Sequence, residues 1–323
     1  MMRTRLPFLY LNALVSFALS LNLAPAQGRG GDRAPRKEIT SARELISQGD
    51  YPAASARLGA VARTYADSPA GDFYQAVALV WKSYVDAPKL DAGSRAFDAE
   101  VEALLLSAIK KAEAAKARAG KSKEEEAEAL YYLGSAYAIR SRLSLYQNHA
   151  IPAARFARAA QDSLDALIKL DPDYSDGYYA AGSILYRVGL LTDSPMGRLA
   201  TSMLGAKSLP AGDRERGLDY LKRAADTGPL TSVDAKLALL EIYTFTEGRP
   251  DQALAIAREL QAKYPDNQTF ARYLLRAYFG LKDRAKLTQT ARQVLAQVRA
   301  GKPNFGPFMK SEAERYLAEA NKL

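Results

Sequence analysis

The segment GRLATSMLGAKS (Gly197–Ser208) contains the residue types of a phosphate-binding loop, in which glycines precede a lysine and a serine. Such a loop has four residues between its glycines, places the lysine directly after the second glycine, and follows a strand. Here seven residues separate Gly197 from Gly205, and Ala206 stands between Gly205 and Lys207. The preceding stretch GSILYRVGLL has helical spacing. Nucleotide binding is therefore not expected.

The apolar residues of this segment favour a different interpretation. Met196, Leu199, Met203 and Leu204 fall at helical spacing, which predicts a short amphipathic helix in an oversized connection. Its apolar face must pack on neighbouring helices, across a groove, or on a partner or membrane surface. An insertion without a function is the alternative.

No other group of residues points to catalysis or to a bound cofactor. The chain has no cysteine, which excludes disulfides, thiol nucleophiles and cysteine-ligated metals. Its one histidine, His149, has no accompanying G-x-S-x-G signature and is expected at the surface or at a helix end. Glu124, Glu125 and Glu126 are expected to open a helix, where acidic residues are favoured. We therefore expect no catalytic residue, no metal site and no cofactor.

The charge of the chain is moderately basic. Its 45 lysines and arginines exceed its 36 acidic residues by nine, and they are spread widely, as solubility requires. Arg140, Arg142, Arg155 and Arg158 are the candidates for a basic patch. Because no nucleic-acid-binding motif accompanies them, nucleic acid is not an expected partner, whereas an anionic lipid or glycan stays open.

The N-terminus has the features of an export signal. Arg3 and Arg5 precede an apolar stretch (6–23), and small residues follow at Ala24 and Ala26. We expect a signal peptide over 1–26, cleaved between Ala26 and Gln27, and a flexible basic linker over 27–37. The protein would then be exported to the periplasm or cell envelope, with no cysteine for lipid attachment. An uncleaved membrane anchor is the alternative.

The rest of the chain has the pattern of an all-α protein. Apolar residues recur at helical spacing from residue 38 onward, alanine is abundant, and strand-like alternation is nearly missing. Ser41 with Glu44 and Ser122 with Glu125 fit the capping box that begins a helix. The closing stretch 308–323 is expected to form a helix that caps the end of the array.

Two patterns recur along this helical part. LYYLGSAY (130–137), YYAAGSILY (178–186), KLALLEIY (236–243) and ARYLLRAY (271–278) precede a turn, and LIKLDPDY, AADTGPL and LQAKYPDN end a helix at a proline. With Gly134, Gly182, Ala253 and Pro265 at matching positions, the chain resembles the tetratricopeptide repeat family. The resemblance implies antiparallel helical hairpins stacked in a right-handed superhelix (an α-solenoid) over 38–323. Extra residues at 140–153 and 190–216 depart from the family pattern and predict longer helices.

The resemblance also implies a concave groove lined by the first helix of each repeat. Transferred by register, the lining residues are Tyr131, Ser135, Ile139, Tyr179, Ser183, Tyr186, Arg187, Glu241, Phe245, Arg272 and Arg276. Tyrosine and arginine suit a protein-binding groove because they combine large contact area with polar groups. The alternative is that several of these tyrosines pack between helices.

The sequence leads to two functional hypotheses. The first is a non-enzymatic, exported scaffold that binds a protein or peptide in its groove, for instance during assembly of a cell-envelope complex. The second is a solute- or lipid-binding protein associated with a transporter, in which the apolar insertion 190–210 covers a pocket. An open groove rimmed by tyrosine and arginine would favour the scaffold, and a closed apolar cavity would favour the solute-binding protein.

Overall fold

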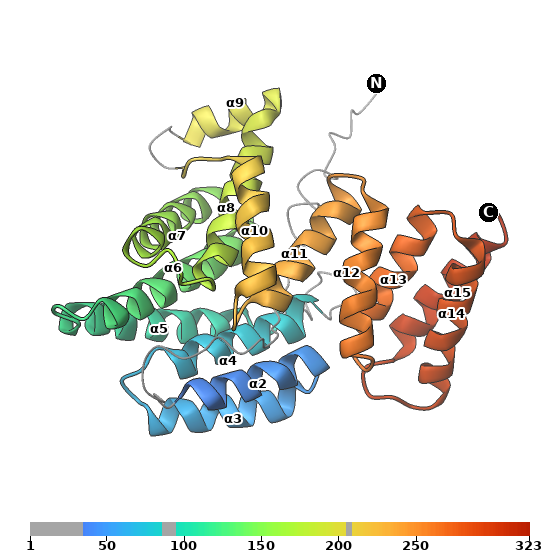
Figure 1. The fold of residues 1–323 in the computed structure, drawn as a ribbon, viewed down its shortest axis with the longest axis horizontal. Coiled ribbons are helices and arrows are strands. Elements are labelled where there is room, and N and C mark those ends of the chain that lie inside the picture. Colours follow the sequence, from blue (N-terminus) through green and yellow to red (C-terminus); the bar gives the residue numbers. More distant parts are fainter. Residues whose placement is uncertain (1–34, 86–94, 205–208) are drawn as a thin grey trace.

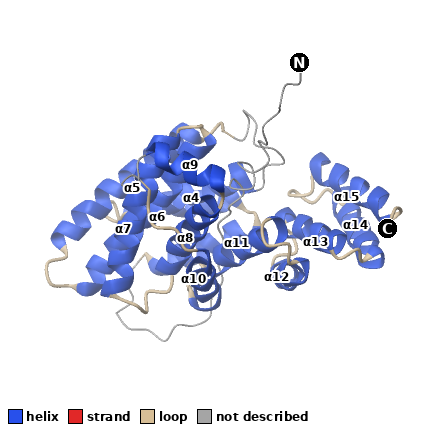
Figure 2. Ribbon diagram, turned by 90° about the horizontal axis from the view of Figure 1, so that it is seen from above, coloured by secondary structure: helices blue, strands red, loops and turns tan. Residues whose placement is uncertain are grey.

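The computed structural model describes residues 35–85, 95–204 and 209–323. These residues form helices joined by turns, with no strand among them, which confirms the all-α class (Figure 2). Within these ranges no helix combines the length and the apolar character needed to cross a membrane. The elements are α2 (Arg36–Gln48), α3 (Tyr51–Thr64), α4 (Ala70–Val80), the π-helical η1 (Trp81–Val85), α5 (Asp98–Arg118), α6 (Lys123–Tyr146), α7 (Ala150–Leu170), α8 (Gly177–Asp193), α9 (Pro195–Leu204), α10 (Arg214–Thr227), α11 (Ser232–Phe245), α12 (Pro250–Lys263), α13 (Gln268–Gly280), α14 (Arg284–Arg299) and α15 (Pro307–Ala320).

The N-terminal predictions fall mostly before the first described helix. The predicted signal peptide, with its cleavage site between Ala26 and Gln27, lies outside the described residues, as does most of the linker. Helix α2 begins at Arg36, so the last two residues of the predicted linker are helical.

One of the two predicted helix starts is present, with its serine as the N-terminal cap. The Ser122 side chain accepts a hydrogen bond from the Glu125 amide at 3.3 Å and begins α6 as expected. Ser41 and Glu44 lie inside α2, so the prediction that a helix starts at Ser41 was wrong. The helix begins earlier because Pro35 occupies the N-terminal cap, just before a run of residues that sustains the helix.

Helices that follow one another in the chain lie side by side (Figure 1). Neighbours along the chain pack as pairs: α2 with α3, α4 with α5, α6 with α7, α8 with α10, α11 with α12, and α13 with α14. Each first member of a pair also contacts the first member of the next pair. We call these six helices (α2, α4, α6, α8, α11 and α13) the first-helix layer.

Burial separates the two kinds of helix. In α11, 11 of 14 residues are buried, whereas α12, its partner, buries only three of 14. A helix that buries one stripe lies at the surface, and one buried almost all round has protein on both sides. The first helices are therefore covered on one side by the second helices and on the other by members of their own layer.

Contacts between distant parts of the chain complete this enclosure. The fully buried Arg43 of α2 donates to Asp234 of α11 at 2.5 Å, across 191 positions of sequence. Close by, the Asn267 side chain before α13 donates to the Ser47 carbonyl of α2 at 2.9 Å. Helix α2 thus contacts the second half of the chain.

The extra residues at 140–153 lengthen the neighbouring helices, as predicted. Helix α6 continues to Tyr146 over 24 residues, and α7 starts at Ala150 and has 21. These long helices have no counterpart in α10 to α13, each of which has 13 or 14 residues.

The buried side chains form two clusters. The larger one runs from α2 to α13, and the smaller one joins α13, α14 and α15. Helix α13 belongs to both, with Phe270 and Tyr273 in the larger and Leu275 and Tyr278 in the smaller. Helix α15, which covers the end of the array as expected, contributes Met309 and Tyr316.

Glycine permits the closest approach between α8 and α10. A Cβ atom on Gly182 would lie 2.8 Å from the Gly217 carbonyl oxygen, and one on Gly217 would lie 2.5 Å from the Tyr186 amide nitrogen. Both distances are shorter than a van der Waals contact, and the obstructing atoms belong to the backbone.

We predict that Gly217→Ala destabilises the protein although alanine is the better helix former. The backbone clash should cost about 1–3 kcal/mol, more than the roughly 1 kcal/mol gained in helix propensity. Gly59→Ala in α3, where a Cβ meets nothing closer than 3.4 Å, is the matched control and should be neutral or stabilising. Urea denaturation of both variants provides the measurement, and equal effects would contradict the prediction.

We also predict that the α2–α11 contact depends on the buried ion pair. Arg43→Ala removes the partner that Asp234 has in α2 and should cost about 3–5 kcal/mol in unfolding free energy. Arg158→Ala, which breaks the exposed pair with Asp162, is the control and should cost less than about 1 kcal/mol. A similar loss in the two variants would show that the buried pair has no special weight.

Candidate functional site

Four neighbouring members of the first-helix layer bring ionisable and aromatic side chains together around Glu241. They act on one another electrostatically or through ring contacts, and we call them the Glu241 cluster. Its members are Arg142 and Tyr146 of α6, Tyr179 and Arg187 of α8, Glu241 and Phe245 of α11, and Arg272, Tyr273 and Arg276 of α13.

Glu241 is the acidic member of this cluster. Its side chain is 8% exposed, and its Oε1 accepts a hydrogen bond from the Tyr273 hydroxyl at 2.8 Å. Its Oε2 is buried and accepts no hydrogen bond among the described residues. Burial raises the pKa of Glu241 to about 7, against the lowering effects of Arg187, the Tyr273 hydrogen bond, Arg142 and Arg272.

Three arginines of the cluster, Arg142, Arg187 and Arg272, act electrostatically on this carboxyl group. Burial lowers the pKa of Arg187, Glu241 raises it again, and Arg142 pushes it down because both are cations. Arg276 lies 5.4 Å from the centre of the Tyr273 ring and 5.2 Å from that of Phe245. Since Phe245 is 48% exposed, Phe245 and Arg276 form the edge through which the cluster meets solvent.

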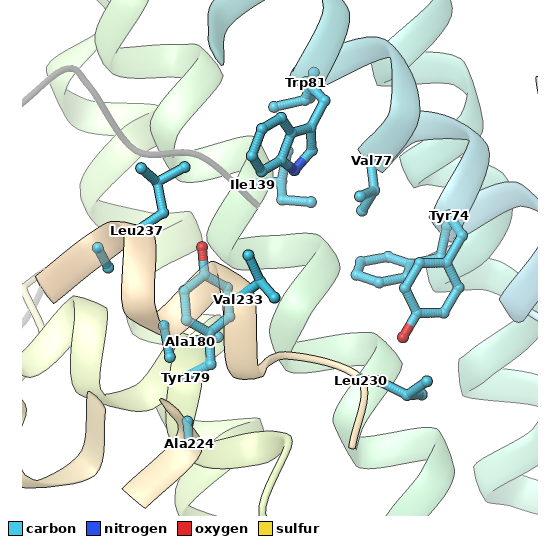
Figure 3. Close-up of a cluster of buried hydrophobic side chains, with 14 of the residues drawn as sticks. Tyr74, Val77, Trp81, Ile139, Tyr179, Ala180, Ala224, Leu230, Val233 and Leu237 are labelled. Atoms are coloured by element: carbon cyan, nitrogen blue, oxygen red, sulfur yellow. The ribbon is translucent and has the colours of Figure 1, made fainter. Parts of the chain in front are cut away.

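Further polar atoms are buried inside the same layer. Two guanidinium nitrogens of Arg43 (Nε and Nη1) and the indole nitrogen of Trp81 have no hydrogen-bond partner among the described residues. Figure 3 shows Trp81 above Ile139, and Tyr179 beside Val233 and Leu237 of α11. Buried polar groups are rarely left unsatisfied, and water or a ligand usually completes them.

Several residues predicted to line a groove pack inside the protein instead. Tyr131 is 2% exposed, and its hydroxyl lies 3.0 Å from that of Tyr74 in α4. Ser135 and Ile139 are buried in α6, and Ser183 donates to the Tyr179 carbonyl of its own helix. For these positions the structure favours the alternative, packing between helices.

Tyr186 belongs to a different group. Its hydroxyl donates to Glu247 at 2.6 Å, and Arg214 of α10 donates to the same carboxylate at 2.7 Å. This group links α8, α10 and the turn after α11. The residues predicted to line the groove therefore belong to different groups in the structure. The ones that belong to the Glu241 cluster are Tyr179, Arg187, Glu241, Phe245, Arg272 and Arg276.

Two members of the cluster, Arg142 and Tyr146, were missed because residues 140–153 were interpreted as an insertion. Since α6 continues to Tyr146, the spacing of Ser135 and Ile139 extends to these positions on the same face. The arginines predicted to form a basic patch do not all lie together. Arg142 joins the Glu241 cluster, and Arg140 pairs with Glu102 of α5.

The segment that was compared with a phosphate-binding loop follows helix α8, not a strand. Helix α9 begins just after α8, and the Ser194 side chain accepts a hydrogen bond from the Gly197 amide at 2.9 Å. The predicted short helix is thus present, and its Leu199 is 58% exposed. The side chains of Met196, Met203 and Leu204, and residues 205–208, lie outside what the structure describes.

The remaining candidates for chemistry lie at helix starts. His149 is exposed and precedes α7, and Glu124, Glu125 and Glu126 occupy the first turn of α6, as predicted. In the described part of the chain no three histidine or carboxylate side chains are grouped so that they could hold a metal ion.

The chain was compared with known proteins. No protein-family model matches it, and no curated protein matches its sequence. The resemblance to tetratricopeptide repeats therefore rests on the residue pattern.

The raised pKa of Glu241 leads to a prediction about stability. Its pKa of about 7 in the folded protein lies above the ordinary value of 4.5, so the folded state binds the proton more tightly. The resulting stabilisation, about 3 kcal/mol, is complete below about pH 4.5 and is lost as the pH rises through 7. The unfolding free energy should therefore fall between about pH 5 and pH 8.

Glu241→Gln should remove most of this pH dependence. Asp176, whose pKa burial raises to about 6, contributes the remainder at lower pH. Glu314→Gln on the exposed face of α15 is the control and should leave the slope unchanged. Urea denaturation across this pH range measures the effect, and an unchanged slope in Glu241→Gln would exclude Glu241 as its source.

Proposed function

We propose that the protein is a non-enzymatic scaffold that binds a protein or peptide partner at the Glu241 cluster. The observation that supports this most is the convergence of arginine and aromatic side chains from α6, α8, α11 and α13, with Phe245 and Arg276 at the exposed edge. Arginine and aromatic residues dominate the energetics of protein interfaces.

We propose further that the helix pairs form a right-handed superhelix of the tetratricopeptide repeat type. The alternation of first and second helices, the contacts along the first-helix layer and the glycines between α8 and α10 support this assignment. Because the first helices are largely buried here, the partner would reach the cluster at its exposed edge, at Phe245 and Arg276.

The proposed place of action is the periplasm or the cell envelope, where the scaffold would help to assemble an envelope complex. The support comes from the basic, apolar and small residues of the N-terminal 26 positions. The expected partner is a protein or peptide rather than nucleic acid, and association with a membrane surface stays compatible with the proposal.

The second candidate is a solute- or lipid-binding protein associated with a transporter. The depth of the cluster favours it, because Tyr179, Glu241 and Arg272 are each more than nine-tenths buried. A small molecule reaches such groups more readily than a folded partner does, whereas an extended peptide reaches them from the Phe245 edge.

Site-specific photocrosslinking in the native host distinguishes the two candidates. A photoreactive amino acid at Phe245 should yield one discrete protein adduct in the envelope fraction. The same amino acid at Leu106, which is exposed on α5 outside the cluster, is the matched control and should yield none.

Combining the Phe245 probe with Arg276→Ala should reduce the adduct several-fold, because Arg276 lies against Phe245 at the same edge. Equal labelling from Phe245 and Leu106 would contradict the scaffold. A small molecule that copurifies with the protein, without any protein adduct, would favour the second candidate.

A further inference from the structure

The turn between α13 and α14 exposes apolar and basic side chains next to one another. Phe279 is 37% exposed and Leu281 is 39% exposed, although both are large and apolar. Lys282, Arg284 and Lys286 follow them and are exposed as well. We call this segment, FGLKDRAK (279–286), the α13–α14 tip.

The cations of the tip are not neutralised by ion pairs. None of the three pairs with an acidic side chain among the described residues. Asp283, the acidic residue of the tip, caps α14 by accepting a hydrogen bond from the Lys286 amide at 2.9 Å. In contrast, the cations of α15 and its end are paired: Lys310 with Glu314, Arg315 with Glu312, and Lys322 with Glu319. The tip therefore keeps a net positive charge, with three cations to one acid.

One of these cations stands in a backbone conformation that suits glycine. Lys282 has a φ of 56°, in the left-handed region. The turns that follow α2 and α11 have glycine in this region, with a φ of 85° at Gly49 and 61° at Gly248. Glycine adopts it without steric cost, whereas a lysine is strained there. Lys282 thus places a cation at the tip at the expense of stability, as residues of binding sites often do.

The tip is packed against helices on two sides. The Phe279 ring contacts the Tyr316 ring of α15, with 5.7 Å between their centres and an angle of 61° between their planes. Pro250 of α12 lies against Gly280, 3.1 Å from where a Cβ atom of that glycine would be. The residues that flank this proline, Arg249 and Asp251, have opposite charges and leave the local balance unchanged. The tip therefore presents its apolar and basic side chains from a defined backbone.

We propose that the α13–α14 tip docks on an anionic membrane surface. Phe279 and Leu281 enter the headgroup region, and Lys282, Arg284 and Lys286 face the lipid phosphates. A bilayer accepts apolar side chains beside cations without a complementary shape, whereas a stable protein interface needs about 800 Å² on each partner. The inference goes beyond the proposed function and does not depend on it, because the tip does not include Phe245.

The absence of cysteine from the chain allows a local test. A single cysteine in place of Leu281, in the full chain, carries a polarity-sensitive fluorophore. Vesicles of equal parts phosphatidylcholine and phosphatidylglycerol should shift its emission to the blue, and vesicles of phosphatidylcholine alone should do so much less. The same label in place of Leu106, exposed on α5, is the control and should not respond. Because the readout is local, binding through another part of the chain does not produce it.

Three variants of the chain labelled at position 281 test the role of the cations. Lys282→Gly should raise the lipid concentration at half-maximal shift about fivefold, since each cation near the surface contributes a factor of this size. Its thermal stability should stay equal or rise, because glycine relieves the strain, and so misfolding cannot explain the loss. Arg284→Ala should have a similar effect on docking. Arg299→Ala, at the other end of α14 and equally exposed, is the matched control and should have none.

Several results would overturn the inference. One is an emission at position 281 that stays unchanged with anionic vesicles, and another is an equal shift with neutral ones. Equal losses in Arg284→Ala and Arg299→Ala would show that the charge of the tip has no special weight. A label that responds to an acidic protein of the envelope fraction but not to vesicles would assign the tip to a protein partner instead. None of these results changes the photocrosslinking expected at Phe245, so the scaffold is tested separately.

Discussion

The buried ion pair between Arg43 and Asp234 is the contact on which the interior of this protein depends. Helices that pack only on their chain neighbours leave one side of each first helix exposed. The pair joins α2 to α11 at one point inside the first-helix layer. Burying two charges costs free energy because both lose their hydration, and their attraction offsets this cost only when the geometry is good. The pair therefore favours one arrangement of the two halves of the chain over looser ones.

Two carboxyl groups on one face of α11 are in contrasting environments. Asp234 pairs with Arg43 at 2.5 Å in a contact between α11 and α2. Glu241 lies two turns further along, surrounded by several arginines, with one oxygen bonded to Tyr273 and the other without a hydrogen-bond partner among the described residues. The same helix thus holds one charge that is compensated and one whose protonation responds to its surroundings.

Local sequence patterns predicted the helices well because their signals act over a few residues. The capping interaction of Ser122, the short helix after α8, and the close contact at Gly182 follow from spacing and residue type. The start of α2 was misplaced because Ser41 and Glu44 also fit the interior of a helix. The position of a residue in a repeat pattern does not determine how exposed its side chain is. Tyr131, which the pattern placed in a groove, is buried against Tyr74.

Contacts between distant residues could not be predicted in this way. Arg43 and Asp234 are 191 positions apart, and no periodicity within either helix indicates that they meet. Arg142 and Tyr146 were missed for a local reason. Helix α6 is longer than the repeat pattern predicts, so both residues lie on the same face of this helix as Ser135 and Ile139. The cluster could therefore be predicted in part, through Arg187, Glu241 and Arg272.

The division of the core into two clusters gives the molecule two cooperative units of unequal size. The last three helices bury a smaller set of side chains than the rest, and their link to α2 is made by Asn267 and Asn304, which donate to its last two carbonyl oxygens. Such a unit opens at a lower free energy than the whole protein unfolds. Helix α13 belongs to both units and carries Arg272, Tyr273 and Arg276, so each opening of the smaller unit loosens one wall of the Glu241 cluster.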